Sequence, residues 1–118
     1  MDKEQARAAL LGVNLVIGLA FLLFPKLSMR LYGVDADANP AAAYPLRFVG
    51  ARSLLFSAML LDEDTADVLT EQTPVIVSTD LAASGLALIT GEVPRRAAVL
   101  GALTSALTAT LGMLGRDT

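Results

Sequence analysis

The chain has 118 residues, enough for one domain, of which 54% are hydrophobic and only 18% charged. Soluble domains carry about 25% charged residues, so this balance, with a mean hydropathy of +0.59, indicates a membrane protein. The net charge of −3 argues against a nucleic-acid partner. The lack of Cys and His excludes disulfides, thiolate ligands, and the commonest general base and metal ligand, so no metal or cofactor is expected.

The first apolar stretch, residues 8–24, carries no charge and one strongly polar side chain, Asn14. Pro25 ends the helix that this stretch predicts. Residues 26–33 (KLSMRLYG) mix apolar and basic side chains, which predicts a short segment at the membrane interface. Residues 34–40 (VDADANP) are expected to form a loop.

The second stretch, residues 45–61, is apolar apart from Arg47 and Arg52, and Pro40 and Pro45 mark its beginning. The residues that follow it, 62–72 (DEDTADVLTEQ), are strongly acidic. We expect them to form a solvated loop.

The third stretch, residues 73–91, has Pro74 in its first turn and a single charge, Asp80. A tight basic turn (EVPRR, 92–96) leads into the fourth stretch, residues 97–115, which has no charge. The Thr and Ser residues of the fourth stretch can donate hydrogen bonds to carbonyls of their own helix.

All four stretches reach the roughly 17 to 25 residues that a membrane-spanning helix needs. The sequence therefore predicts an all-α fold, an antiparallel bundle of four transmembrane helices, in which residues 1–118 form one integral membrane domain of a multi-pass cell-membrane protein. The alternative is a soluble four-helix bundle with a very apolar core. Lys26, Arg30, Arg95 and Arg96 favour a cytoplasmic location for the first and third loops, with both termini outside.

Arg52 needs a partner, because an arginine near the bilayer centre costs about 2.5 to 3.5 kcal/mol. Asp80 is the only acid inside the four stretches. At about 1.5 Å per helical residue, Arg52 lies about 15 Å from Asp62 and Asp80 about 10 Å from Thr73, so their depths agree. The sequence predicts a buried Arg52–Asp80 ion pair, which either fixes the helix register or belongs to a polar pocket in the bundle.

Every stretch carries a polar residue near its midpoint, which makes a ligand-binding pocket at that depth a hypothesis. The candidate residues are Asn14, Arg47, Arg52, Asp80, Thr104, Ser105 and Thr108. Other interpretations stay open: Asn14 can hydrogen-bond between helices, and membrane helices hold Thr and Ser freely.

Small residues recur at helical spacing and predict the faces on which helices pack closely. These faces are Asn14 and Gly18 on the first helix, Ser78, Ala82 and Gly85 on the third, and Gly101, Ser105, Thr108 and Gly112 on the fourth.

The segments RFVGARSLLFSAMLL (47–61), TDLAASGLALITG (79–91), VPRRAAVLGAL (93–103) and RLYGVD (30–35) carry a resemblance. They resemble a family of small, uncharacterised four-helix membrane proteins, loosely similar to the DoxX-like group. Its members look like this chain in having an arginine after a glycine in the second helix (Gly50, Arg52), an acid in the third (Asp80) and a basic turn before the fourth. The resemblance implies a location and a fold, and no chemistry.

Three functions compete. The leading hypothesis is a non-enzymatic membrane module that binds an apolar small molecule or lipid, or that is a homo-oligomer or a subunit of a larger membrane assembly. The second is a membrane enzyme on a lipophilic substrate, an isomerase, cyclase or epoxide hydrolase, with Asp80 as general acid or base and Arg52 tuning it. The third is a proton-coupled transporter that uses Asp80.

Overall fold

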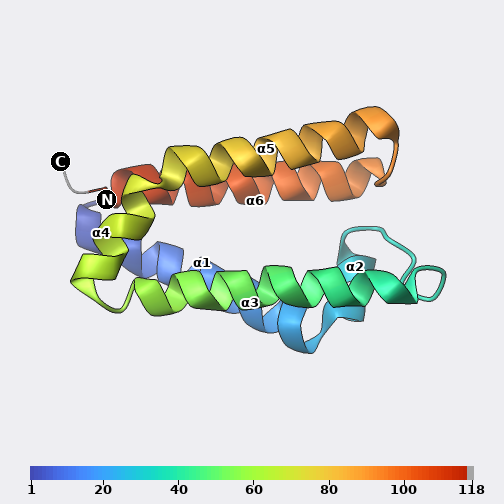
Figure 1. The fold of residues 1–118 in the computed structure, drawn as a ribbon, viewed down its shortest axis with the longest axis horizontal. Helices are drawn as coiled ribbons and strands as arrows, with labels where there is room; N and C mark the ends of the chain where they lie inside the picture. The colour runs from blue at the N-terminus through green and yellow to red at the C-terminus, as the bar shows by residue number, and fades with distance from the viewer. Residues whose placement is uncertain (117–118) are drawn as a thin grey trace.

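The computed structural model describes residues 1–116, which form helices joined by turns and contain no strand. The helices, drawn in Figure 1, are α1 (Lys3–Leu23), α2 (Pro25–Leu31), the 3-10 turn η1 (Pro40–Ala42), α3 (Ala43–Met59), α4 (Glu63–Glu71), α5 (Thr73–Thr90) and α6 (Arg95–Leu114). The predicted all-α fold is confirmed.

Helix α1 begins at Lys3, five residues before the predicted start of its apolar stretch. Asp2 and Gln5 form a capping box, in which the Gln5 N–H donates to Asp2 Oδ1 at 2.8 Å and the Asp2 N–H donates to Gln5 Oε1 at 3.2 Å. These bonds satisfy two amides that have no partner within the helix. Caps thus extend the helix into a polar segment that hydropathy alone does not mark.

The segment after Pro25, for which the sequence predicts only a short interfacial segment, is helical. In α2, Ser28 and Met29 are buried against the rest of the protein, whereas Leu27 and Leu31 are more than half exposed. Exposed leucines beside the exposed Arg30 suit the boundary between lipid and water.

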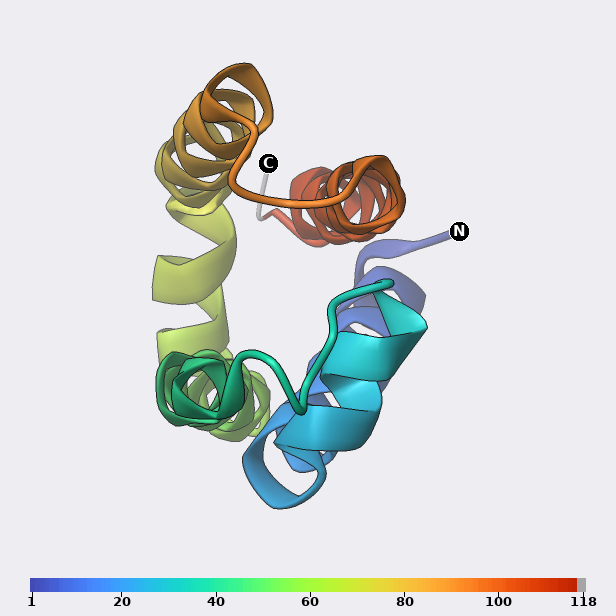
Figure 2. The same ribbon diagram turned by 90° about the vertical axis from the view of Figure 1, so that its right-hand side faces the viewer.

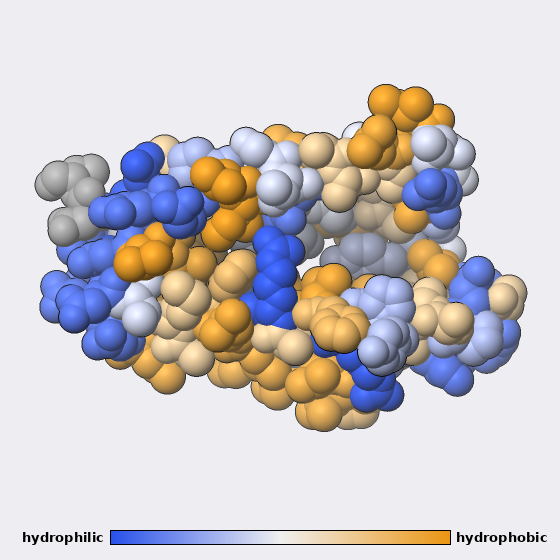
Figure 3. Space-filling view, in the orientation of Figure 1, coloured by the Kyte–Doolittle hydropathy of each residue, from blue (hydrophilic) through white to orange (hydrophobic). Residues whose placement is uncertain are grey.

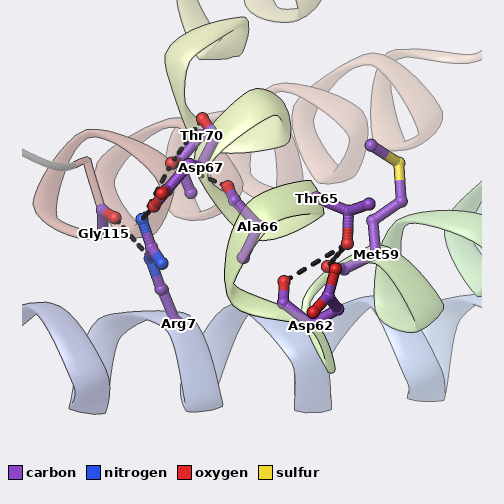
Figure 4. A network of polar contacts seen from close by, with 8 residues as sticks. All are labelled: Arg7, Met59, Asp62, Thr65, Ala66, Asp67, Thr70 and Gly115. Atoms are coloured by element: carbon purple, nitrogen blue, oxygen red, sulfur yellow. Dashed lines mark hydrogen bonds and ion pairs between the residues drawn. The ribbon is translucent and has the colours of Figure 1, made fainter.

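The acidic segment 62–72 is mostly helix α4, and the prediction of a solvated loop is wrong there. Its charged residues are interrupted by Ala66, Leu69 and Thr70, which lie on one helical face and are buried. Glu63 and Asp64 occupy the first turn, where negative charge is favourable. The Thr65 hydroxyl donates to the Met59 and Asp62 carbonyls at 2.5 and 3.2 Å and so holds the turn from α3 into α4 (Figure 4).

The long helices form two layers, α1 with α3 and α5 with α6, as Figure 1 shows. Packing of α1 along α6 joins the layers on one side. On the other side α4 crosses from α3 to α5 near both chain termini, while α2 and the α5–α6 turn lie at the opposite end (Figures 1 and 2). Within residues 1–116, α3 and α5 do not pack along one another.

Two glycines set the close approach of α1 and α3. A Cβ on Gly50 would lie 2.5 Å from the Leu22 nitrogen, and one on Gly18 would lie 2.9 Å from the Gly50 carbonyl oxygen. Ser57 is buried at the same interface and donates a hydrogen bond to the Leu11 carbonyl at 3.2 Å. The prediction that Gly18 marks a close helix contact is confirmed.

The outer surface is apolar. Val16, Leu103 and Ile89 are 68%, 62% and 84% exposed, and hydrophobic residues cover much of the face in Figure 3. A soluble bundle would bury such side chains, so this surface argues against the soluble alternative.

Two helices, α1 and α6, are long and apolar enough to cross a membrane, which suggests membrane association. The pair α4 and α5 (through Ile89) meets the same criteria only as one span bent by 49°. Helix α3, which has 17 residues, is not among these candidates.

Candidate functional site

A cavity of about 400 Å³ lies between the two layers. Its wall carries six of the seven polar residues predicted to share a site: Asn14, Arg52, Asp80, Thr104, Ser105 and Thr108. They come from four different helices, α1, α3, α5 and α6. The remaining wall is mainly apolar and includes Leu10, Ile17, Val49, Phe56, Ile76 and Val77.

Arg52 and Asp80 form an ion pair across the seam between α3 and α5. The Arg52 Nη2–Asp80 Oδ1 distance is 3.3 Å, and the guanidinium also lies 5.1 Å from the centre of the Phe56 ring. The two side chains are 44% and 31% exposed. The structure thus brings the residues together as the sequence predicts, but the pair is not buried, because α3 and α5 do not close over it. Figure 3 shows this face hollowed between the layers.

Three other polar side chains of the wall, those of Asn14, Thr104 and Thr108, hydrogen-bond within their own helices. Asn14 Nδ2 donates to the Leu10 carbonyl at 3.0 Å, so this bond lies inside α1 and does not join two helices. The Thr104 hydroxyl donates to Leu100 at 2.9 Å, and the Thr108 hydroxyl to Thr104 and Ser105, both at 3.1 Å. The predicted bonding of these threonines to their own helix is confirmed.

Arg47 lies apart from the other predicted site residues. It is exposed, and its Nη1 donates to the Leu22 carbonyl at 2.9 Å. A basic side chain satisfies a carbonyl at the C-terminal end of α1 in this way. Its contact is therefore with a helix terminus, outside the lining of the cavity.

A second cavity of about 450 Å³ adjoins the first. Five residues line both cavities: Phe21, Tyr32, Val49, Ala83 and Ser84. The rest of the second wall comes from α2, α3, α5 and α6 and from Val34 and Val93 in the connections, and nearly all of it is apolar. The two cavities follow one another along the long axis of the molecule, away from α4.

A buried ion pair does exist, but it joins Arg7 to Asp67 at 2.5 Å. Arg7 is only 7% exposed; its Nε also donates to the Gly115 carbonyl at 2.7 Å, and its Nη2 approaches the hydroxyl of Thr70 at 3.5 Å. Figure 4 shows these groups converging from α1, α4 and the end of α6. The network ties α4 to both layers.

Sequence reasoning missed this network because it treated Asp67 as part of a solvated loop. The available signal was the helical spacing of Ala66, Leu69 and Thr70 within the acidic segment. That spacing places Asp67 beside the buried face.

The predicted faces of small residues have mixed outcomes. A Cβ on Gly112 would collide with the Thr73 side chain, so α6 approaches α5 closely there. Cβ atoms on Gly85 and Gly101 would meet nothing within 4 Å, so the prediction of close helix packing at these two positions is wrong. Gly101 instead widens the first cavity, which it lines.

No protein-family model, curated protein or solved structure matches the chain. The resemblance to small four-helix membrane proteins thus stays a prediction.

Proposed function

We propose that this protein is a four-span integral membrane protein that binds a lipophilic small molecule between its two helix layers, without turning it over. The observation that carries the proposal is the cavity of about 400 Å³, whose apolar wall holds one cluster of polar side chains contributed by four helices. Pockets of about 300 to 1,000 Å³ with this composition are typical of small-molecule sites.

The four proposed spans are α1, α3, α5 and α6. Helix α3 has 17 residues, the lower end of the roughly 17 to 25 that cross a bilayer. Arg47 lies near its beginning and so falls near the membrane surface, and Arg52 is paired with Asp80. Both arginines are thereby compatible with a span.

The seam between α3 and α5 offers the ligand a route from the bilayer. These helices do not pack along each other within the described residues, and the polar contact that joins them there is the Arg52–Asp80 pair. A lipophile dissolved in the membrane reaches such a site sideways, without crossing water.

Binding is favoured over turnover because the cavity offers little acid–base chemistry. Asp80 is the only carboxylate that lines it among residues 1–116, and Arg52 already engages that carboxylate. An isomerase or hydrolase of the acid–base type uses positioned proton donors and acceptors on both sides of the reacting atom.

The test fills the cavity at a position where space is available. Gly101→Leu places a side chain in the wall, and a Cβ there meets no neighbour within 4 Å. Gly85→Leu is the matched control, an equally open helical glycine outside the cavity lining. Both changes raise helix propensity, so neither should lower stability.

The measurement is the molar amount of lipophilic compounds that stay bound through purification in detergent, identified by mass spectrometry. We expect one compound class to be retained by the wild type and by Gly85→Leu, and to fall several-fold in Gly101→Leu. Equal amounts in all three proteins, or none beyond bulk membrane lipid, would reject the proposal. A compound recovered in chemically altered form would favour the enzyme hypothesis.

A further inference from the structure

The two adjoining cavities form one elongated site, and we propose that its ligand is a single-chain lipid with an uncharged hydroxyl at one end. This inference rests on the proposed binding function and adds the class of ligand and its direction. The hydroxyl lies at the level of Arg52 and Asp80, and the hydrocarbon chain runs through the second cavity toward α2 and the α5–α6 turn.

The first step is charge. Arg52 and Asp80 are the only charged residues that line either cavity among residues 1–116, and they neutralise each other at 3.3 Å. A charged ligand head, either carboxylate or ammonium, would pair with one of these two residues and leave the other without an opposite charge in a low-dielectric site. The site therefore favours a neutral head.

The second step is hydrogen-bonding capacity. The hydroxyls of Thr104 and Thr108 donate to helix carbonyls, and one N–H of Asn14 donates to the Leu10 carbonyl. The side-chain oxygens of all three residues remain able to accept a hydrogen bond. Asp80 also accepts, while Arg52 has N–H groups beyond the one given to Asp80. An alcohol both donates and accepts, whereas an ester or ketone only accepts.

The third step is the direction of the chain. Beyond the shared wall, the second cavity is lined by apolar side chains such as Met29, Leu46, Ala87 and Ala98. Its one serine outside the shared wall, Ser28, donates to the Ala20 and Phe24 carbonyls. Among residues 1–116, this part of the second cavity has no free polar side chain to donate a hydrogen bond to a ligand, so we place the hydrocarbon chain of the ligand at this end.

The fourth step is length. At about 1.5 Å per helical residue, the distance along α5 from Asp80 to Ala87 is about 10 Å, and along α6 from Thr104 to Ala97 it is also about 10 Å. From Arg52 to Leu46 along α3 it is about 9 Å. Along three helices, the distance from the level of Arg52 and Asp80 to the far end of the second cavity is thus about the same. An elongated cavity of this length suits one extended hydrocarbon chain.

The experiment uses two photoreactive forms of octanol, whose extended chain matches the length of the elongated cavity, one with its diazirine beside the hydroxyl and one with it near the terminal methyl. The full-length protein is reconstituted in phosphatidylcholine vesicles, irradiated with each probe and mapped by peptide mass spectrometry. We expect the head probe to label residues around Arg52, such as Ser53 and Val77, and the tail probe to label Met29, Leu46 or Ala97.

A variant pair on α6 adds a control for folding. Ala98 lines the second cavity, whereas Ala102 is exposed and lines neither. Ala98→Leu should abolish tail-probe labelling of the second cavity and keep head-probe labelling of the first. Ala102→Leu should change neither pattern.

The possible results separate the two proposals. Labelling of the first cavity by both probes, with none in the second, overturns the elongated site and keeps the proposed binding function. Head-probe labelling of the second cavity reverses the direction and also overturns the inference. Labelling confined to lipid-facing residues by both probes rejects the binding function and the inference together.

Discussion

Two arginines in this small chain have opposite surroundings. Arg52 lies beside an open seam, with one carboxylate and one aromatic ring as its contacts. Arg7 is buried and contacts a carboxylate, a hydroxyl and a helix-terminal carbonyl on two other elements. The number of partners and the burial, rather than the residue type, distinguish a cavity group from a structural one.

We first predict energetic coupling between Arg52 and Asp80. Arg52→Leu, Asp80→Leu and the double variant should show a coupling free energy of about 0.5–1.5 kcal/mol, modest because the pair is partly exposed. The measurement is a double-mutant cycle on unfolding in detergent. Arg30 and Asp37, 3.8 Å apart and 58% and 85% exposed, give the control cycle, where coupling should be near zero. Additive effects at Arg52 and Asp80 would contradict the contact.

The second prediction concerns Arg7. Arg7→Leu should lower the free energy of unfolding by about 2–3 kcal/mol, because Asp67 and the Gly115 carbonyl lose their donor in a mostly buried site. Arg7→Lys should recover part of the loss, since lysine keeps the charge but not the planar donor fork. Unfolding in detergent measures both. Arg30→Leu, at an exposed site, should stay within about 0.5 kcal/mol of the wild type; a similar value for Arg7→Leu would refute the network.

Helices α1 and α3 owe their contact to backbone proximity at Gly18 and Gly50. Without Cβ atoms, the two helices bring their main chains together, and in the proposed membrane location lipid tails would not drive helices together as water does. Contacts between backbones therefore carry much of the stability of this layer. In the other layer, α5 and α6 approach closely at Gly112 but leave open space at Gly85 and Gly101.

The third prediction tests this difference between layers. Gly50→Ala should cost about 1–3 kcal/mol, because its Cβ would meet the main chain of α1, which cannot move aside cheaply. Gly85→Ala should instead add about 0.5–1 kcal/mol through helix propensity alone. Both values come from unfolding in detergent. If the two substitutions had the same sign and size, the close crossing of α1 and α3 would be disproved.

The whole molecule has two polar ends and an apolar middle. The termini and α4 lie at one end, and α2 with the α5–α6 turn lies at the other (Figure 1). With four spans, these ends face opposite sides of the membrane. The balance of Lys and Arg favours the α2 end in the cytoplasm.

The fourth prediction follows from that arrangement. The chain has no cysteine, so Glu63→Cys and Arg96→Cys each create a unique labelling site. In intact cells, an impermeant thiol reagent should label Glu63→Cys and should label Arg96→Cys only after lysis. Labelling of both from outside would exclude four spans, whereas the reverse pattern would change the orientation alone. Release of the protein by a carbonate wash would exclude membrane insertion altogether.

The positions of most helices can be predicted from local sequence. Apolar runs, prolines and caps determine where α1, α3, α5 and α6 lie, because these signals act within a few residues. The Arg52–Asp80 contact could be predicted for a similar reason, because Asp80 is the only acid within the four apolar stretches. Helix α4 was also readable, from Ala66, Leu69 and Thr70, but its acidic composition masked the periodicity.

Only the tertiary structure decided how far the helices stand apart. The sequence placed Asn14, Arg52, Asp80 and Thr104 at one depth, yet depth does not say whether four helices close upon these groups or leave a cavity. The backbone contact at Gly50, the anchoring of α4 by Arg7, and the lack of packing between α3 and α5 together open that space. These are long-range relations between segments, and local pattern carries no information about the distance between them.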